Sequence, residues 1–401
     1  MTFFKFMPNS LKRCLLVTAI CSTVIQCQAD ANQPKAMPAR ELEKTKHEAW
    51  VQHLSEKIKR LPKDDDLLYQ RAYHLQELGR NREAVADCDI VLKRQPNNSD
   101  ALNLRGRAFN SLGMYDEAIR DLNQATSKNP KNKWTYYNRG ISYKGKKELE
   151  KALKEFNFCL KLDPAWAKAL CERAKVYEGL GNYQKEIDDT TSCLICNPNY
   201  ADALNLRGYA KYCLEQFDEA LVDLKRSGEL NPFNPWVHKN LGMVYEWQEK
   251  HDKAIESLSE AIKLKPDFAY AFCARGCAKN NIGDFKGALC DTNKAIQLDP
   301  KESWYFDCRG YAKAGLNDHR GAIDDFTRSI DLYPERGWTY VQRLKSRIAI
   351  GDLSGITDFA KAFELSQKDG KTQVNTTITK QVAKSADRIK GAIDSLFSTT
   401  K

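Results

Sequence analysis

The sequence predicts an all-α fold, a right-handed superhelical α-solenoid of stacked antiparallel helix pairs. Three columns of residues recur together with a period of 34: a small residue, an alanine and a proline. A period of this length marks one supersecondary unit, which must stack on its neighbours to bury its apolar face. The prolines keep this spacing without insertion or deletion at Pro62, Pro96, Pro130, Pro164, Pro198, Pro232, Pro266, Pro300 and Pro334.

The small residues are expected where the two helices of a pair cross, because small side chains let helix backbones approach closely. They stand 24 positions before each proline at Ala72, Gly106, Gly140, Ala174, Gly208, Gly242, Gly276 and Gly310. An alanine stands 12 positions before the proline in every period except one, where Glu186 replaces it. The proline itself is expected to end the second helix of the pair.

A small residue, an aromatic residue such as Phe109 or Tyr143, an alanine and a proline, in this order, resemble the tetratricopeptide repeat (TPR) over about residues 63–368. The resemblance implies eight 34-residue TPR units over 63–334 and a degenerate ninth repeat over 335–368 that lacks the alanine and the closing proline. Residues 30–62 are expected to form a tether and an N-terminal capping helix. The apolar spacing of 369–401 predicts a C-terminal capping helix.

A second pair of columns predicts a structural ion pair inside each repeat. Arginine stands 25 positions before the proline in seven of eight periods, and an acid stands nine positions before it in seven. The repeat that has Leu241 in place of the arginine also has Ser257 in place of the acid. Because both are lost together, we expect the arginine of the first helix to contact the acid of the second.

The N-terminus has the pattern of a signal peptide over residues 1–29. Lys12 and Arg13 precede an apolar run of about 12 residues that is too short to cross a bilayer comfortably, and small residues lead to a cleavage site after Ala29. We therefore expect an exported protein, periplasmic or secreted, with no integral membrane span in the mature chain. A lipid anchor at Cys27, an uncleaved anchor and a cytoplasmic protein remain as alternatives.

Composition is that of a soluble helical repeat protein, with 29% charged and 42% hydrophobic residues. The net charge of +10 arises from basic residues that are interleaved with acids. This pattern lacks the basic stripe of a nucleic-acid-binding surface, so no nucleic acid is expected as a partner.

Ten cysteines follow the signal segment, and most are expected to pack as small apolar side chains. Cys273 and Cys277 lie one turn apart on a first helix, and Cys308 lies on the first helix of the next repeat. A disulfide from Cys308 to one of the other two is sterically conceivable in an oxidising compartment.

No catalytic or metal-binding constellation is recognisable in the sequence. The six histidines do not form a ligand pair such as H-E-x-x-H. The segment from Gly140 to Lys147 approaches a phosphate-binding loop, but Lys147 stands where the magnesium-binding hydroxyl is needed. We expect no enzyme, no cofactor and no metal.

Binding of a protein or peptide is the remaining function, and stacked repeats supply an extended concave groove lined by first helices. Four positions after the prolines, the residues Trp236, Tyr270, Trp304 and Trp338 form an uninterrupted aromatic column, with Trp134 at the same position earlier in the chain. Such rings are either anchors for an extended peptide or packing contacts with the preceding second helix. Further groove candidates are Asn103, Arg107, Asn138, Asn205, Tyr209, Asn240, Met243, Trp247 and Tyr311.

Asparagine amides in this position can bond both backbone groups of a bound strand. Some relatives grip a chaperone's terminal carboxylate with a lysine and asparagine clamp on three successive first helices. Only Asn138 and Lys168 match that clamp, and Glu172 has the wrong charge, so this ligand is not expected. Two alternatives to a plain binding scaffold remain: a redox or thiol-dependent protein that uses the groove cysteines, and a secreted factor acting on host proteins.

Overall fold

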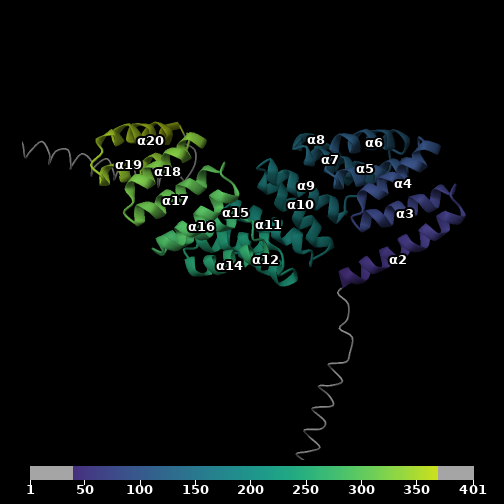
Figure 1. The fold of residues 1–401 in the computed structure, drawn as a ribbon, viewed down its shortest axis with the longest axis horizontal. Coiled ribbons are helices and arrows are strands. Elements are labelled where there is room, and N and C mark those ends of the chain that lie inside the picture. Colours follow the sequence, from purple (N-terminus) through teal and green to yellow (C-terminus); the bar gives the residue numbers. More distant parts are fainter. Residues whose placement is uncertain (1–38, 369–401) are drawn as a thin grey trace, which may run out of the picture. The chain divides into compact units, whose positions relative to one another are not determined.

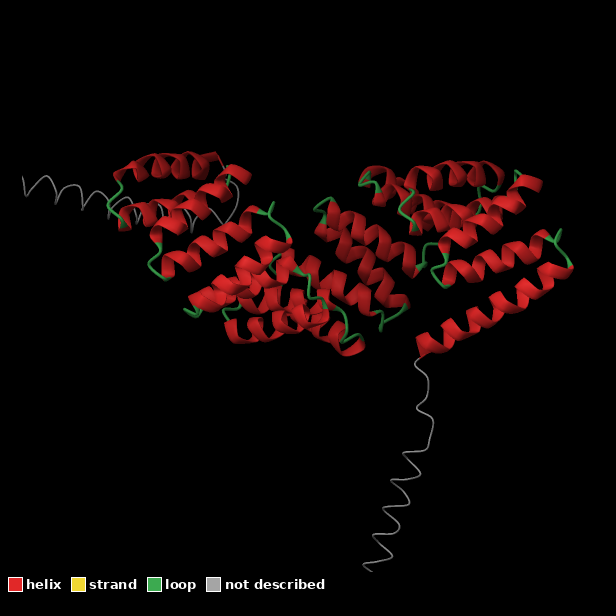
Figure 2. Ribbon diagram, viewed as in Figure 1, coloured by secondary structure: helices red, strands yellow, loops and turns green. Residues whose placement is uncertain are grey.

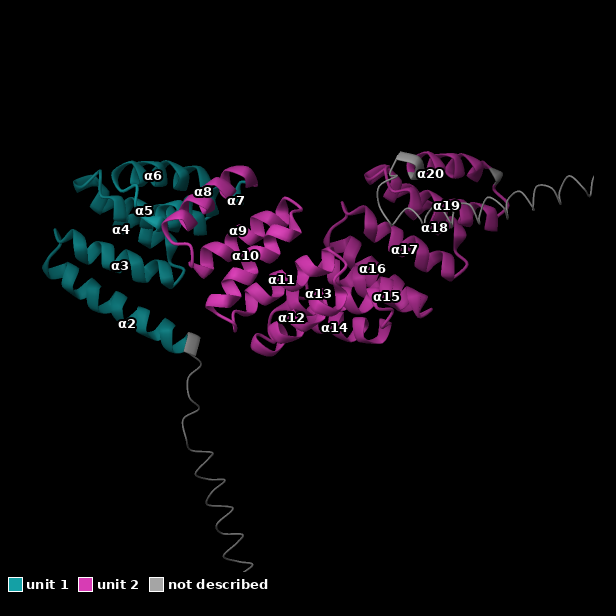
Figure 3. Cartoon of the chain, turned by 180° about the vertical axis from the view of Figure 1, so that it is seen from behind, with its two compact units in different colours: residues 1–146 teal, residues 147–401 magenta. Residues whose placement is uncertain are grey.

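The computed structural model describes residues 39–368, and every regular element in that range is helical (Figures 1 and 2). The chain separates after Lys146 into two compact units (Figure 3). The division falls between the two helices of the third 34-residue repeat. The expected signal peptide, residues 30–38 of the tether and the expected helix of 369–401 lie outside the described residues.

Unit 1 contains the expected N-terminal capping helix and two complete helix pairs, followed by one further first helix. The capping helix packs on the first pair through Val51, which belongs to the same apolar cluster as Leu75 and Leu104. In chain order the helices of unit 1 are α2 (Ala39–Arg60), α3 (Asp65–Glu77), α4 (Asn81–Arg94), α5 (Ser99–Ser111), α6 (Tyr115–Lys128) and α7 (Lys133–Gly145).

Unit 2 begins with a second helix and continues with helix pairs to the end of the described chain. Its helices are α8 (Leu149–Leu162), α9 (Ala167–Gly179), α10 (Tyr183–Cys196), α11 (Ala201–Cys213), α12 (Phe217–Leu230), α13 (Pro235–Trp247), α14 (His251–Leu264), α15 (Ala269–Asn281), α16 (Phe285–Leu298), α17 (Ser303–Gly315), α18 (His319–Leu332), α19 (Gly337–Ala349) and α20 (Ile356–Lys368). A short 3₁₀ turn, η2 (Leu353–Gly355), precedes α20.

The repeating prolines set the helix boundaries as expected. Each second helix from α4 to α18 ends two residues before its proline, because proline lacks the N–H that would continue the helix and restricts the residue before it. The next first helix starts three residues after the proline. In several repeats an Asx side chain caps it; the Asn98 side chain, for example, accepts hydrogen bonds from the N–H groups of Asp100 and Ala101.

The turn between the two helices of each pair contains one residue in the left-handed region. Glycine occupies this position in five repeats, for example Gly283 with φ 81°. Lys147, Glu215, Glu249 and Asn317 hold the same conformation with φ between 56° and 63°. The turn therefore imposes its backbone geometry even where the residue carries a side chain.

The small residues lie where the helices of a pair cross, as predicted. A Cβ atom built on Gly242 would stand 2.5 Å from Cγ of Leu258, and one on Gly106 would stand 2.8 Å from Cγ of Leu122. The alanines of the other column have no exposed surface. Only glycine or alanine permits this approach of first and second helix.

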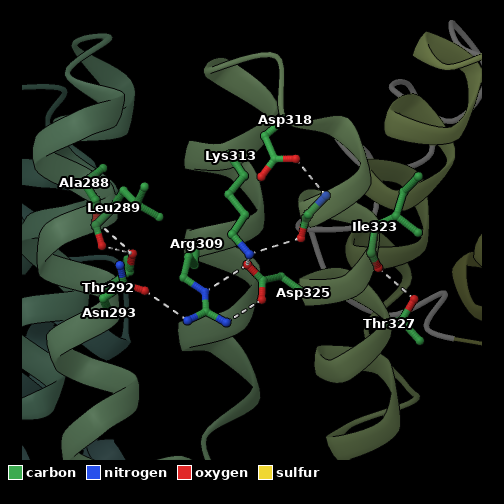
Figure 4. A network of polar contacts seen from close by, with 11 residues as sticks. Ala288, Leu289, Thr292, Asn293, Arg309, Lys313, Asp318, Ile323, Asp325 and Thr327 are labelled. Carbon is green, nitrogen blue, oxygen red and sulfur yellow. Dashed lines mark hydrogen bonds and ion pairs between the residues drawn. The ribbon is translucent and has the colours of Figure 1, made fainter.

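The structure shows the predicted ion pair between arginine and acid in the repeats that begin with α3, α5, α9, α11, α15 and α17. In one of them, Arg309 donates from Nε and Nη2 to both carboxylate oxygens of Asp325, at 2.9 and 2.6 Å (Figure 4). Its third nitrogen, Nη1, donates to Asn293 of the preceding repeat at 3.0 Å. An arginine of this kind, on a first helix, thus joins the second helix of its own repeat to the second helix of the preceding repeat. The sequence pattern did not reveal this second contact. The other five pairs are Arg71–Asp87, Arg105–Asp121, Arg173–Asp189, Arg207–Asp223 and Arg275–Asp291.

The repeat without the arginine lacks the guanidinium, the acid and the acceptor on the preceding repeat. Leu241 replaces the guanidinium and packs beside the buried Leu224 and Val244. Ser257 replaces the acid, and Lys225 stands at the position of the acceptor on the preceding repeat. The three positions of the polar link have therefore changed together, and Leu241 makes an apolar contact in its place.

The ninth repeat keeps the ion pair although it has lost the alanine and the closing proline. Arg343 pairs with Asp358 at 2.6 Å and donates to Thr327 of the preceding repeat at 3.0 Å. The acid stands 15 residues after the arginine, whereas it stands 16 residues after it in the other repeats. This polar link therefore tolerates a shift of one residue in the second helix.

Within unit 2 the first helices contact one another in series, α9 with α11 and onward to α19, while each second helix contacts only the first helices beside it in the described chain. We call the surface formed by α9, α11, α13, α15, α17 and α19 the first-helix wall. None of the helices over residues 39–368 has the length and apolar character needed to cross a bilayer.

Candidate partner-binding surface

The aromatic column lies along the first-helix wall, and its rings contact residues of neighbouring repeats. Tyr270 and Trp304, from α15 and α17, have ring centroids 5.1 Å apart. Trp236 on α13 meets the edge of Phe268 at 4.6 Å and remains 48% exposed. The rings therefore form a partly exposed series along the wall, held in place by each other and by the loop that precedes α15.

A cavity of about 360 Å³ opens on the C-terminal part of the wall. Trp304, Tyr311 and Trp338 all line it, so three residues of the predicted groove meet in one place. The rings of Tyr311 and Trp338 stack at 6.5 Å. Asn280 and Lys345 add polar groups to the lining.

Asp307 is a buried acid in the wall of this cavity that the sequence analysis did not single out. One carboxylate oxygen is engaged by Arg336 and by the Thr339 hydroxyl at 3.2 Å. The other oxygen is closed to solvent. Burial raises the pKa of Asp307, and hydrogen bonding by the Ser329 hydroxyl and the charge of Arg336 partly offset this effect.

Two asparagines of the wall present amide oxygens without partners among residues 39–368. Asn240 donates from Nδ2 to Asn205 Oδ1 at 2.9 Å, and its own Oδ1 is buried and accepts no hydrogen bond. Asn280 donates to the Cys308 carbonyl at 3.0 Å, and its Oδ1 is likewise unsatisfied. A buried acceptor without a donor is costly, so each of these two asparagines carries an unsatisfied polar atom that is closed to solvent.

Lys239, which the sequence did not mark as a groove residue, lies among the rings of three predicted groove residues, Tyr209, Trp236 and Tyr270. Its Nζ lies 4.8 Å from the Tyr209 ring centroid, 5.2 Å from that of Tyr270 and 5.8 Å from that of Trp236. Burial lowers the pKa of Lys239 to about 8, and the charge of Glu178 opposes this shift. We call Lys239 and these three rings the lysine pocket. Its only sequence signal was a lysine three positions after a column tryptophan.

Two other predicted residues, Met243 and Trp247, lie on α13 and mainly contact aromatic side chains. The Tyr270 hydroxyl donates to the Met243 sulfur at 3.6 Å. Trp247 stacks on Phe217 and donates from Nε1 to the Tyr212 hydroxyl at 2.7 Å, yet remains 58% exposed. Trp247 thus offers an exposed ring in a fixed orientation.

The predicted residues of unit 1 form a smaller set. Trp134 on α7 is 42% exposed. Asn138 donates to Asn103 at 3.0 Å, the same contact that Asn240 makes with Asn205. Arg107 forms an ion pair with Glu77 at 2.7 Å, so its charge is compensated within the chain.

The three cysteines chosen from the sequence lie together between α15 and α17. Cys277 and Cys308 form a disulfide with Cα atoms 5.9 Å apart, and Cys308 lies in the wall of the cavity. Cys273 is a free, fully buried thiol, and the three sulfurs lie within 4.8 Å of one another. Burial raises the pKa of Cys273, so its thiol is protonated near neutral pH and is a poor nucleophile.

Comparison with known families finds repeats of one kind. Models described as tetratricopeptide repeat match residues 135–165 and 235–268, and a model described as TPR repeat matches residues 106–147. The comparison with curated proteins gives no match.

Two solved structures show that the same fold occurs elsewhere. The APC/C hetero-tetramer Cut9-Hcn1 matches with a TM-score of 0.58 and 19% identity over 74% of this chain and 58% of that chain. A tetratricopeptide repeat protein from Parabacteroides merdae matches with a TM-score of 0.51 and 20% identity over 62% of this chain and 98% of that chain. This chain thus spans a little over half of the first of these proteins, and both likenesses concern the fold alone.

Proposed function

We propose, from the premise that this chain is a tetratricopeptide-repeat protein, that it is a non-enzymatic scaffold which binds an extended peptide or partner protein along its first helices. The observation that carries the proposal is the series of exposed rings on contacting first helices. Trp236, Trp247 and Tyr311 supply rigid apolar area to a bound segment.

Partly exposed rings suit this role because an aromatic side chain loses little conformational entropy when it is covered. The cavity beside Trp304 and Trp338 is large enough for one side chain of a bound segment. The proposal therefore places apolar anchor residues of the partner at the rings.

Affinity capture from the source cell's exported proteins, with the chain from Asp30 to Lys401 as bait, tests the proposal. The decisive variant carries Trp236→Ala, Trp304→Ala and Trp338→Ala. The matched control carries Ile195→Ala and Phe233→Ala, two apolar residues that are each 78% exposed and lie outside the first helices. We expect the control to retain the partner and the triple variant to lose it while keeping its helical circular dichroism. Retention of every partner by the triple variant would refute binding through the aromatic column.

We further propose that the protein acts after export, on the support of the basic, apolar and small-residue order of residues 1–29. Expression of the full chain in its source cell and N-terminal sequencing of the product test this step. We expect Asp30 as the first residue and recovery outside the cytoplasm. A product that begins at Met1 in the cytosol, or at a lipid-modified Cys27, would contradict cleavage after Ala29.

A further inference from the structure

We propose that Cys273, Cys277 and Cys308 together bind one zinc ion when the disulfide between Cys277 and Cys308 is reduced. Three thiolates would hold the ion, and its fourth coordination position would be left to a water molecule. We call these three residues the cysteine cluster. The inference goes beyond the proposed function, because binding of the metal does not depend on a peptide in the groove.

The first observation is that three sulfurs converge from two neighbouring first helices. Cys273 and Cys277 lie one turn apart on α15, Cys308 lies on α17, and the three sulfurs are within 4.8 Å of one another. Thiolates that bind one zinc ion at about 2.3 Å stand about 3.8 Å apart. The three side chains already meet in a space of this size, so they can surround a single ion.

The second observation is that the cysteine cluster opens on the cavity beside Trp304 and Trp338. Cys277 and Cys308 both line this cavity, whereas Cys273 has no exposed surface. The cavity volume of about 360 Å³ gives an ion room to enter and leaves space for a water molecule as the fourth ligand. The site therefore has the entry path that a metal ion needs.

The third observation is a third cysteine that the disulfide does not need. The Cys273 thiol packs in the same apolar cluster as Ala295, Tyr305 and Cys308. An apolar shell of this kind limits the access of water to a metal site and lowers the local dielectric constant. A disulfide uses two of the three converging sulfurs, whereas a zinc site uses all of them.

The charges around the cysteine cluster favour a divalent ion over a monovalent one. Thiolates are soft ligands that select Zn²⁺ or Cu⁺ over Mg²⁺ and Ca²⁺. With three thiolates, Zn²⁺ leaves one negative charge and Cu⁺ leaves two. The acids Asp307, Glu302 and Asp291 act electrostatically on Cys273. The smaller residual negative charge is therefore less costly beside them, and we assign the site to Zn²⁺.

Loading of the site takes two balanced steps. A small-molecule thiol first reduces the disulfide: the S–S bond breaks, Cys277 and Cys308 each become a thiol, and two molecules of the reductant are joined by a new disulfide. Zn²⁺ then forms three Zn–S bonds, and each cysteine releases its proton to solvent. Zinc keeps its oxidation state throughout. The disulfide and the zinc site are thus alternative states of the same residues.

The experiment titrates the chain from Asp30 to Lys401 with Zn²⁺ against a chromophoric chelator, in the oxidised form and after reduction and removal of the reductant. Co²⁺ serves as the spectroscopic probe, because its sulfur-to-metal charge-transfer absorption grows with the number of thiolate ligands. The decisive variant is Cys273→Ala, which leaves both partners of the disulfide in place. The matched control is Cys171→Ala, which removes another buried thiol of a first helix, one that lies 3.4 Å from the Cys193 sulfur.

We expect the reduced wild type and reduced Cys171→Ala to bind one Zn²⁺ with equal affinity and to give the cobalt–thiolate absorption. The oxidised wild type and reduced Cys273→Ala should bind Zn²⁺ at least about 100-fold more weakly, since even the hydrogen-bond partners of a metal ligand contribute about 10- to 100-fold. Zn²⁺ should also raise the midpoint of thermal unfolding of the reduced wild type but not that of reduced Cys273→Ala.

Three results would overturn the inference. Equal zinc affinity of reduced wild type and reduced Cys273→Ala would show that Cys273 is not a ligand. Loss of binding in Cys171→Ala would place the metal at Cys171 and Cys193 instead. Binding of Cu⁺ without binding of Zn²⁺ would refute the assignment to a divalent ion.

Helical circular dichroism verifies that each variant is folded. If Cys273→Ala does not fold, Cys308→Ala takes its place, because it removes a ligand from the other helix of the cysteine cluster. Reduced Cys308→Ala should then lose the zinc ion, and retention of zinc at wild-type affinity would contradict the site. All of these measurements are made without a peptide, so their outcome leaves the test of the proposed function independent.

Discussion

Arg309 and Asp325 form a two-point ion pair that also reaches the neighbouring repeat. The arginine occupies both oxygens of the acid and donates its remaining nitrogen to Asn293, while Lys313 approaches the same acid at 2.8 Å. One guanidinium thereby sets the distance between the helices of its own pair and the distance to the preceding pair. The recurrence of this contact from repeat to repeat makes it a structural element of the array.

We expect Arg309→Leu to destabilise α17 and α18 by roughly 2–3 kcal/mol, somewhat less than the loss of a fully broken buried ion pair, because Lys313 still contacts the acid. The double variant Arg309→Leu, Asp325→Ser copies the natural repeat that has Leu241 and Ser257, and it should recover part of the loss. Hydrogen exchange of the α17 and α18 amides measures the effect within the array. If the double variant is less stable than Arg309→Leu, the two residues do not act as one unit.

Glu186 is expected to destabilise the protein above acidic pH. Its side chain is fully buried, neither carboxylate oxygen has a partner in the described structure, and burial raises its pKa to about 9. The unfolded chain ionises at lower pH than the folded one, so stability is lost as pH rises from about 4.5 towards 9.

Glu186→Ala should restore the alanine found in the other repeats and raise stability at pH 7 by about 1–3 kcal/mol, the cost of an unpartnered buried polar group. Thermal unfolding of the wild type and the variant at pH 5 and pH 8 measures this, and the gain should be larger at pH 8. Glu186→Gln removes the titration with little change of shape. An equal gain from Glu186→Ala at both pH values would show that the carboxyl does not titrate in this range.

Glu249 holds the left-handed conformation that glycine adopts in the turns of other repeats, with φ 56°. Glu249→Gly should stabilise the turn by up to about 1 kcal/mol, because a left-handed residue with a Cβ costs about 1–2 kcal/mol and the freer unfolded chain offsets part of the gain. Gly283→Ala, at φ 81° in a turn where a Cβ meets open space, is the reciprocal variant and should destabilise. Urea denaturation that moves both variants in one direction would contradict this account of the turn.

The disulfide joins Cys277 on one first helix to Cys308 on the next, two cysteines that are 31 residues apart in sequence. The chain-entropy model gives about 3–4 kcal/mol for a loop of this length, so Cys277→Ala with Cys308→Ala should lower the midpoint of thermal unfolding. Mass spectrometry of non-reduced peptides should find Cys277 joined to Cys308, while Cys273 reacts with a thiol reagent only after unfolding. Cys290→Ser, at an exposed free thiol, is the matched control. Labelling of Cys277 or Cys308 in the native, non-reduced protein would contradict the bond.

The repeat architecture was predictable because it depends on local and periodic signals. Proline, the small residue and the alanine act within one helix pair, and the same packing recurs wherever they recur. One repeat has Leu241 in place of the arginine and Ser257 in place of the acid. Because both changes occur in the same repeat, the sequence predicted that these two positions are in contact. The contact of Arg309 with Asn293 was missed because its acceptor column varies among asparagine, aspartate, serine and threonine.

The candidate surface was predictable only in part. Trp236, Tyr270, Trp304 and Trp338 could be chosen from their spacing, since position in the repeat determines the helix face. Lys239 could not, because its place among the rings of Tyr209, Trp236 and Tyr270 depends on how α11, α13 and α15 pack side by side.

By itself the sequence determined the all-helical repeat, the helix boundaries, the close crossings and the recurring ion pair between arginine and acid, because each depends on residues a fixed number of positions apart. Tertiary structure decided which cysteine joins Cys308, that Trp304, Tyr311 and Trp338 share one cavity, and that Lys239 lies among three aromatic rings. These depend on the angle and spacing between successive first helices, which arise from many small packing contacts that no single column of the sequence records.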